Sequence, residues 1–509
     1  MTDTTAPSNP SASSNPAAST PVPELADRLD PRSRQALVLL LAAVFVVFLN
    51  ETTMSVAIPT IIDDLGITAA SGQWLTTAFA LTLAVVIPIT GWLLQRLQTR
   101  PVFILAMSLF TVGTLIAATA PGFELLVFGR VVQASGTAIM MPLMMTTVLT
   151  IVPMHLRGRI MGRISIVMSV APAIGPAVSG FLLQAFDNYW RGLFFVMLPI
   201  ALVMLVIGIL RVPNVSETRI VPLDSLSVVL SAIGFSGLVF GLSSIGEAAD
   251  DAALLPPWIP LVIGGVFLAL FVLRQFALQR RDAAFLDLRT FTSRTFTVSL
   301  SMLAIGMLSL FGMVIVLPIY LQYGLKLEPN QIGLMLLPGG LAMGLLGPIV
   351  GRLYDRFGPR PLVVPGSIMV SAVFWALAFG LGAETPLWFV VAAHIGLSLG
   401  LAFLFTPLFS SGLGALPRHL YSHGSSLVAT IQQVAGAAGT AMFIAFLAIG
   451  MAGAGETDVT IASPEQIASG VHLAFLAGAI TTLALVAVSF LVRKPVEPEV
   501  SDESLHAGH

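Results

Sequence analysis

Apolar stretches of about 20 residues recur along nearly the whole chain and constrain its fold more than any other feature. Of the 509 residues, 56% are hydrophobic and 10% are charged, whereas soluble proteins carry about 25% charged residues. A stretch of that length crosses a bilayer as a helix, and a helix satisfies its own backbone hydrogen bonds inside the hydrocarbon. The sequence therefore predicts an all-α integral membrane protein.

Fourteen spans can be placed on the sequence. They fall near 36–58, 74–94, 101–120, 123–151, 161–184, 192–210, 223–245, 258–278, 296–322, 331–350, 361–382, 387–414, 424–451 and 470–492. Residues 1–33 are rich in Ser, Pro, Ala and Thr, which predicts a disordered tail. This tail lacks the basic-then-apolar pattern and cleavage site of a signal peptide, so we expect the first span to stay attached.

Basic residues fall almost entirely on one side of these spans. If the N-terminus is cytoplasmic, 21 of the 24 Lys and Arg residues lie inside, Arg191 and Lys326 lie outside, and Arg130 lies within a span. This is the positive-inside distribution, and one missed helix would have scrambled it. We expect a multi-pass protein of a bacterial inner (plasma) membrane with both termini cytoplasmic.

Glu51 is the only carboxylate well inside a predicted span, in the segment AVFVVFLNETTMSVAIP. An ionised side chain at that depth costs about 2.5 to 3.5 kcal/mol on insertion scales. Arg130 lies at a similar depth, where its charge would offset the desolvation of the acid. We interpret the two residues as a pair that handles protons or the charge of a substrate; a static ion pair is the alternative.

Three further polar side chains within the predicted spans are candidates for a function. His394 is a candidate for proton exchange, because a free imidazole titrates near neutral pH, although a lone histidine on an apolar helix is more often a hydrogen-bonded structural residue. Gln432 and Gln433 lie near the middle of span 424–451. They could bind polar groups of a substrate or simply pack between helices.

Two loops repeat one pattern. GWLLQRLQTRP (Gly91–Pro101) and GRLYDRFGPRP (Gly351–Pro361) each place an Arg five and nine residues after the Gly and a Pro ten residues after it. The second span then corresponds to the tenth, so that two six-helix halves flank two inserted helices. We predict an N-terminal half at 34–211, an insertion at 212–295, a C-terminal half at 296–493 and a cytoplasmic tail at 494–509.

The chain resembles the fourteen-span drug:proton antiporter branch of the major facilitator superfamily over roughly residues 36–493. Four motifs carry the resemblance: the two basic loops, LLVFGRVVQASGTAIMMP in the fourth span, APAIGPAVSGFLL in the fifth, and LNETTMSVAIPTI in the first. The resemblance implies the major facilitator fold, with two six-helix halves plus two inserted central helices and a substrate site between the halves.

Some positions depart from this family pattern. The first loop has Gln95 where the family usually has Asp, and the antiporter motif has Ala171 and Ser179 in place of Gly. In the first span Asn50 takes the usual Asp position, and the acid follows one residue later as Glu51. One residue turns a side chain by about 100° around a helix, so the two positions face different neighbours.

The repeated loops are interpreted as latches that close the cytoplasmic side. Their residues are Gly91, Arg96 and Arg100 in the first loop and Gly351, Asp355, Arg356 and Arg360 in the second. We expect Asp355 to be stabilised by the positive end of the following helix and to pair with Arg352 or Arg356. Because Gln95 replaces Asp, the first latch is expected to rely on hydrogen bonds. Simple membrane anchoring by the basic residues is the alternative.

The antiporter motif predicts a bent fifth span. Pro172 and Pro176 remove backbone donors, and Gly175 and Gly180 let a neighbouring helix approach closely. We expect a hinge or a tight seam between the halves; ordinary helix packing is the alternative.

Other chemistry is not indicated. Without cysteine the chain has no disulfide or thiolate metal site, and it lacks the phosphate-binding loop of an ATPase. His419 and His423 have metal-ligand spacing, but we place both in a cytoplasmic loop and expect no metal. Basic residues are spread along the inner membrane face rather than clustered for nucleic acid.

These observations predict a proton-coupled exporter of hydrophobic or cationic compounds that works by alternating access. It would need no cofactor beyond the proton gradient, would not be an enzyme, would bind no nucleic acid and would act as a monomer. Asn50, Gln432 and Gln433 are candidates to line its cavity. The alternatives are a dedicated exporter of one metabolite, lipid or antibiotic, a lipid-processing membrane enzyme, and a transporter-like sensor.

Overall fold

The computed structural model describes residues 30–187, 189–216, 218–219, 222–249, 255–456, 459 and 461–493, and this part of the chain contains helices and no strand. Its long helices are α1 (Pro31–Leu65), α2 (Ala69–Arg96), α3 (Thr99–Thr119), α4 (Phe123–Ile151), α5 (Met154–Ala185), α6 (Arg191–Arg211), α7 (Ser225–Ala249), α8 (Trp258–Gln279), α9 (Arg294–Ile319), α10 (Pro329–Phe357), α11 (Arg360–Gly380), α12 (Leu387–Gly414), α13 (Tyr421–Gly453) and α14 (Pro464–Ser489). Short helical turns η1 (Leu288–Thr292), η2 (Tyr320–Gly324) and η3 (Arg418–Leu420) connect some of them. Fourteen of the described helices are long and apolar enough to cross a membrane, which confirms the predicted fold class.

Local signals set several helix ends. The Asp30 carboxylate accepts a hydrogen bond from the Arg32 amide at the start of α1, and Gly66, with φ +60°, ends the helix in the left-handed conformation that favours glycine. Ser463 and Gln466 cap the start of α14 reciprocally.

One predicted boundary is wrong in a way that matters for the site. The loop expected before residue 424 is the first turn of α13, and residues 421–430 are all buried. His423 is therefore a buried helical residue. Small residues such as Ser422 and Ser425 look loop-like in sequence, but here they let α13 pack closely against the other half of the molecule.

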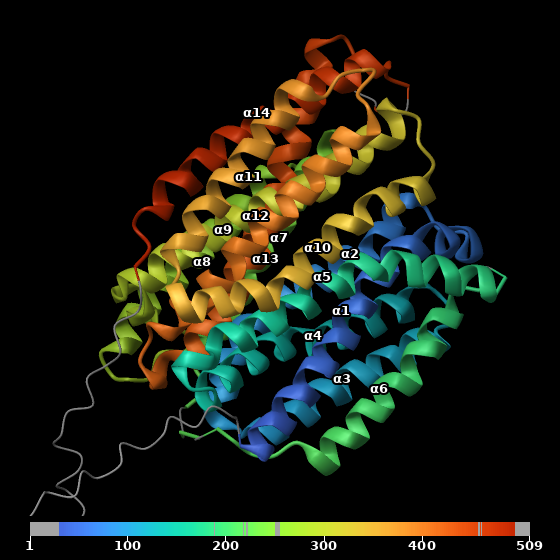
Figure 1. Cartoon of the computed structure of the whole chain (residues 1–509). Coiled ribbons are helices and arrows are strands. Elements are labelled where there is room, and N and C mark those ends of the chain that lie inside the picture. The colour runs from blue at the N-terminus through green and yellow to red at the C-terminus, as the bar shows by residue number, and fades with distance from the viewer. Residues whose placement is uncertain are drawn as a thin grey trace, which may run out of the picture.

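The long helices form two groups of six with a helical hairpin between them in sequence (Figure 1). In the first group α3 packs on α4 and α6, and α1 packs on α5. In the second group α13 packs on α9 and α14, while α11 packs on α12 and α14. We call these groups the N-half (α1–α6) and the C-half (α9–α14).

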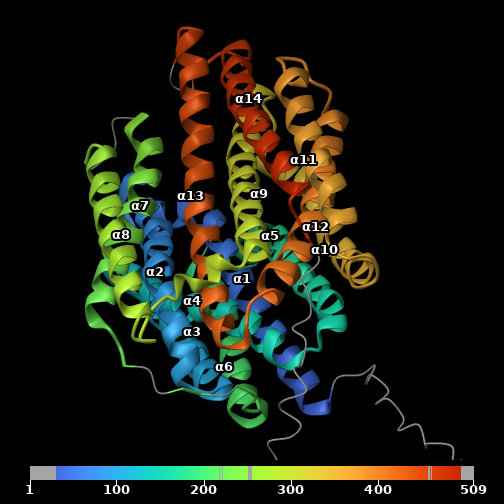
Figure 2. The ribbon, with the colours of Figure 1, turned by 90° about the vertical axis from the view of Figure 1, so that its left-hand side faces the viewer.

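Two helix pairs make the most extensive contacts between the halves. One seam is α5 against α10, and the other is α2 against α13. The inserted hairpin, α7 and α8, packs on itself and through α7 on both α2 and α13 (Figure 2). The hairpin therefore covers the second seam and contacts both halves.

The end of the bundle at which α2 and α10 end and α5 and α13 begin carries exposed Arg159, Arg163, Arg352 and Arg356. We call it the basic face. Hydrogen bonds join the halves near this face: Thr146 with Ser425, Ser165 with Thr406, Arg157 with Tyr421, Gln95 with His423, and Asp355 with the Gly158 and Arg159 amides. The described halves are thus closed against each other at the basic face.

Candidate substrate and proton site

Helix α1 presents Asn50 and Glu51 on different sides. Asn50 is 2% exposed, and its Oδ1 has no hydrogen-bond partner among the described residues. Glu51 is half-buried, and within the described part of the chain its carboxylate has neither a hydrogen bond nor an ion pair. Both side chains therefore retain unused capacity to bind a ligand or a proton.

Arg130 on α4 has partners that the sequence analysis did not identify. Its Nη1 donates to Gln133 Oε1 at 2.6 Å, and Gln133 Nε2 donates to Thr114 Oγ1 on α3 at 2.8 Å. The guanidinium carbon lies 4.1 Å from the centre of the Phe79 ring on α2, within the range of a cation–π contact. Arg130 Nε is buried and has no partner among the described residues.

Glu51 and Arg130 are close enough to interact electrostatically, but the ion pairs of the described residues do not include them. The static ion pair that was an alternative from sequence is therefore absent in this conformation. Gln133 could have been found from the sequence, because it follows Arg130 by three residues and so lies on the same side of α4.

The backbone beside Gln133 is held by close helix packing. A Cβ atom on Gly113 of α3 would lie 2.3 Å from the Gln133 backbone nitrogen, a separation that only a glycine permits. Gln133 and Thr114 are both fully buried. The series of hydrogen-bonded side chains from Thr114 through Gln133 to Arg130 thus rests on a rigid contact between α3 and α4.

An apolar cluster lies on the basic-face side of this group. It contains Phe79, Leu83 and Ile87 of α2, Ala134 and Ala138 of α4, and Ala429 of α13. One helical turn further from the basic face, α4 carries Arg130 and α13 carries Gln432 and Gln433. Both glutamines are half-buried, and no hydrogen bond of the described residues involves them. The two halves thus bring polar groups to a similar level above a shared apolar cluster.

His394 lies in the C-half, away from the Arg130 group. Its Nε2 is 3.0 Å from the Leu336 carbonyl oxygen of α10, and its buried Nδ1 has no partner in the described part of the chain. A Cβ atom on Gly339 would lie 2.2 Å from His394 Cδ2. This geometry is that of a tie between α12 and α10; a role in proton exchange stays a prediction.

Asp355 has different partners from those expected. Its two carboxylate oxygens accept hydrogen bonds from the backbone amides of Gly158 at 2.8 Å and Arg159 at 2.9 Å, near the start of α5 in the other half. The expected ion pair with Arg352 or Arg356 is absent among the described residues: Arg352 Nε donates to the Pro348 carbonyl, and Arg356 lies over the Phe357 ring. The prediction was wrong because the nearest helix start belongs to α5 rather than α11.

The remaining loop residues lie near the same face. A Cβ atom on Gly91 would lie 3.1 Å from Ser426 Oγ of α13. Arg96 lies over the Trp92 ring, 5.5 Å from its centre. The Arg100 side chain donates to the Ile209 carbonyl, and its amide donates to Asn214. Arg360 is exposed at the start of α11.

The antiporter motif packs mainly within the N-half. Pro172 and Pro176 lie inside α5, and a Cβ atom on Gly175 would lie 2.0 Å from Thr52 Oγ1 of α1. A Cβ atom on Gly180 would meet nothing within 4 Å. The expected close approach between halves is therefore made neither at Gly175 nor at Gly180. It occurs on another side of α5, where a Cβ on Gly340 of α10 would lie 2.5 Å from Ala173 Cβ.

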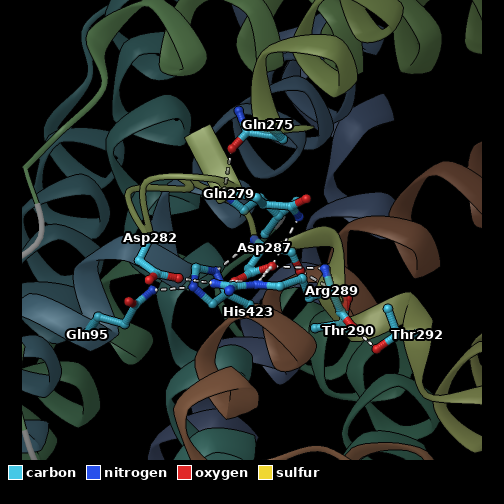
Figure 3. A network of polar contacts seen from close by, with 10 residues as sticks. Gln95, Gln275, Gln279, Asp282, Asp287, Arg289, Thr290, Thr292 and His423 are labelled. Carbon is cyan, nitrogen blue, oxygen red and sulfur yellow. Dashed lines mark hydrogen bonds and ion pairs between the residues drawn. The ribbon is translucent and has the colours of Figure 1, made fainter. Parts of the chain in front are cut away.

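Beside the α2–α13 seam, a polar network links both halves to the segment that follows the inserted hairpin (Figure 3). Gln95 Nε2 lies 2.8 Å from His423 Nε2, and the Asp287 amide donates to His423 Nδ1 at 3.2 Å. The Arg289 side chain binds the Asp287 carboxylate, with a shortest distance of 2.7 Å. Burial alone would raise the pKa of Asp287, but the hydrogen bonds from Arg289 hold that pKa below its usual value. Gln95 thus joins the two halves by a hydrogen bond rather than an ion pair, as expected, and its role as a latch stays a prediction.

The same network continues into the hairpin. Gln275 of α8 accepts from the Leu286 amide and donates to Ser227 of α7. Ser227 donates to Asp224, which also binds Arg274 at 2.6 Å. The sequence analysis missed this network because its members are far apart in the chain.

Comparison with known proteins agrees with the fold. A model of the Major Facilitator Superfamily matches residues 40–440. A Bacillus subtilis protein named uncharacterized MFS-type transporter YcnB is 38% identical over 470 residues, which cover 92% of this chain and 97% of that protein. Lincomycin resistance protein LmrB of the same organism is 37% identical over 463 residues, which cover 90% and 95% of the two chains. The multidrug resistance protein B homolog of Mycobacterium tuberculosis strain H37Rv is 33% identical over 428 residues, which cover 83% and 77%.

Solved structures show the same fold at low sequence identity. The human organic anion transporter MFSD10 (TETRAN) matches with a TM-score of 0.63 and 14% identity, over 90% of this chain and 100% of that chain. FucP, a transporter solved in the outward conformation, matches with a TM-score of 0.58 and 12% identity, over 91% and 100%.

Proposed function

Because the chain belongs to the major facilitator superfamily and is a multi-pass membrane transporter rather than an enzyme, we propose that it exports hydrophobic, cationic compounds from a bacterial cell in exchange for protons. Two relatives support the direction of transport, since they are named for resistance to lincomycin and to multiple drugs. The energy source would be the proton gradient, and no cofactor would be needed. A single chain would suffice for transport.

The observation that carries this proposal is the unpartnered carboxylate of Glu51. A charge inside a membrane span is costly and normally serves a function. A proton neutralises the carboxylate, and a cationic substrate pairs with it, so the two ligands compete for the same group. Competition of this kind couples the export of one ligand to the entry of the other. His394 is a second candidate for proton exchange.

Orientation gives the described conformation a place in the cycle. By the positive-inside rule the basic face would be cytoplasmic, in the plasma membrane of the cell and with both termini on that side. Since the halves are joined at the basic face, this conformation would be closed to the cytoplasm. It is the state in which substrate would leave outward and a proton would enter.

A dedicated antibiotic exporter is the second candidate. The name of the lincomycin resistance relative favours it, and so do Gln432, Gln433 and Asn50, because their amides could bind polar groups of one defined compound. Transport of radiolabelled lincomycin in the presence of competing unlabelled compounds separates the candidates. A broad exporter would be inhibited by many unrelated cations, and a dedicated exporter by lincomycin alone.

The test of proton coupling is Glu51→Gln in inverted membrane vesicles that accumulate ethidium. We expect the variant to lose accumulation driven by a pH gradient, because the amide cannot take up a proton. Exchange of ethidium without a gradient should be weaker than in the parent, because the amide cannot form an ion pair with the cation. Glu124→Gln is the matched control, since Glu124 is an exposed acid in the first turn of α4. Full gradient-driven accumulation of ethidium by Glu51→Gln at several pH values would contradict proton coupling through Glu51.

A further inference from the structure

Arg130 has two neutral partners, and it is also close enough to the unpaired acid Glu51 to interact with it electrostatically. Gln133 accepts from its Nη1, and the Phe79 ring lies under its guanidinium. These neutral groups attract a guanidinium less strongly than a carboxylate does. Its buried Nε has no partner in the described structure. An unsatisfied buried donor on a permanently charged group requires an explanation, and a further acceptor in another conformation supplies one.

The direction of the hydrogen bonds explains why Gln133 can only accept from Arg130. Thr114 Oγ1 lies 2.7 Å from the Phe110 carbonyl, which can only accept, so the hydroxyl proton points there. The Thr114 oxygen then accepts from Gln133 Nε2, and the Gln133 carbonyl oxygen faces Arg130. The contact of Gly113 with the Gln133 backbone fixes the position of this acceptor.

We propose that Gln133 and Phe79 hold Arg130 in a parked position, from which it moves to Glu51 when that carboxyl releases its proton. This inference rests on the proposed function of Glu51. With Glu51 protonated, Arg130 has no better partner than Gln133. Once Glu51 is ionised, its carboxylate attracts the guanidinium more strongly than the Gln133 amide does, so Arg130 moves to Glu51. Gln133 is therefore a positioning residue that sets the pH at which Glu51 exchanges its proton.

Among the charged side chains on the helices that pack against α1, Arg130 is the one that acts electrostatically on Glu51. The other charged groups of these helices lie near helix ends: Arg96 on α2, Glu124 on α4, Arg157, Arg159 and Arg163 on α5, and Arg191 and Arg211 on α6. On α1 itself the other charges are Arg32, Arg34, Asp63 and Asp64, at its two ends. Movement of Arg130 is thus the change that most alters the electrostatic potential at the Glu51 carboxylate.

Two substitutions of Gln133 should move the pH response in opposite directions. Gln133→Met removes the acceptor, so Arg130 pairs with Glu51 permanently and stabilises its charged form. Gln133→Glu gives Arg130 a fixed carboxylate and places a second negative charge near Glu51. The measurement is the pH at which tetraphenylphosphonium releases half the maximal number of protons from purified protein. We expect a shift of about one pH unit downward for Gln133→Met and upward for Gln133→Glu.

Two threonines of α3 provide a milder test in case the Gln133 variants fold poorly. Thr114→Val removes the acceptor that orients Gln133 and should shift the midpoint downward by less than Gln133→Met. Thr111→Val is its control, because Thr111 is also buried on α3 and its hydroxyl has no partner among the described residues.

The outcomes separate this inference from the proposed function. Equal midpoints in Gln133→Met, Gln133→Glu and the parent would overturn the parked position, even if Glu51→Gln abolishes coupling. A purely structural role would lower transport in both Gln133 variants without moving the midpoint, and would overturn it as well. Proton release that persists in Glu51→Gln would instead overturn the role of Glu51.

Discussion

At the scale of single residues, neutral groups hold the Arg130 guanidinium, while the Glu51 carboxylate has no ion pair among the described residues. Glu51 stands out in sequence because it is a charge in an apolar segment. Gln133 lies three residues after Arg130 on α4, whereas the contact of Gln133 with Thr114 depends on how α3 and α4 are rotated against each other. Gly175 is a similar case. The antiporter motif predicts a close helix approach at this residue, but only the structure identifies α1, through Thr52, as the neighbouring helix.

Gly175 and Gly180 allow a matched prediction on one helix. Gly175→Ala should lower the free energy of unfolding by about 1 to 3 kcal/mol, because its Cβ would lie 2.0 Å from Thr52 Oγ1 and 2.9 Å from Thr52 Cβ. Gly180→Ala should leave stability unchanged or slightly higher, since its Cβ has open space. Thermal unfolding in detergent measures both. Equal losses in the two variants would contradict the α1–α5 contact.

At the scale of helices, the α5–α10 seam depends on direct backbone contact across the halves. A Cβ atom on Gly351 would lie 2.1 Å from the Gly158 carbonyl oxygen, and one on Gly162 would lie 2.3 Å from the Gly347 carbonyl oxygen. Asp355 adds two hydrogen bonds to α5 amides at the same level. This contact is specific to a conformation closed at the basic face, so it bears on conformational balance more than on folding.

Gly351→Ala should therefore open the basic face. The added methyl group pushes α10 away from α5, and each 1 kcal/mol of destabilisation changes the ratio of states about fivefold. The chain has no cysteine, so Ser425→Cys, at a buried position between the halves, reports opening by its rate of reaction with a soluble maleimide. Gly333→Ala, on the same helix with open space around it, is the control. An unchanged labelling rate in Gly351→Ala would count against the seam as a latch.

At the scale of the whole molecule, the two seams differ. The α5–α10 seam relies on glycine contacts, whereas the α2–α13 seam is covered by the inserted hairpin and tied to it through His423 and Asp287 (Figure 3). The hairpin keeps its own helices together through Asp224, directly before α7, and Arg274 of α8. Movement of the halves must therefore either carry the hairpin along or break the network at His423.

Acid sensitivity of the hairpin follows from Asp224. The hydrogen bonds from Arg274 lower the pKa of Asp224 to about 2, below the unfolded value of about 3.9. The stabilisation is therefore complete above about pH 4 and lost as the pH falls through 2. We expect Asp224→Asn to lower the free energy of unfolding by about 0.5 to 1 kcal/mol, equally at pH 5 and pH 8. Thermal unfolding checks this, with exposed Asp63→Asn as control; a loss that varies between pH 5 and pH 8 would contradict it.

The sequence by itself determined the number of spans, the sidedness of the basic residues, the repeat of two halves and the place of a buried acid. These properties are local or additive. Hydropathy is summed over about 20 residues, and the Lys and Arg residues of the loops are counted separately for each side of the membrane. Three partners follow only from the tertiary fold: Thr114 orients Gln133, Asp355 binds α5 amides, and His423 is buried against Gln95 and Asp287. Such partners depend on helix rotation and on contacts between distant segments, and no local pattern specifies either.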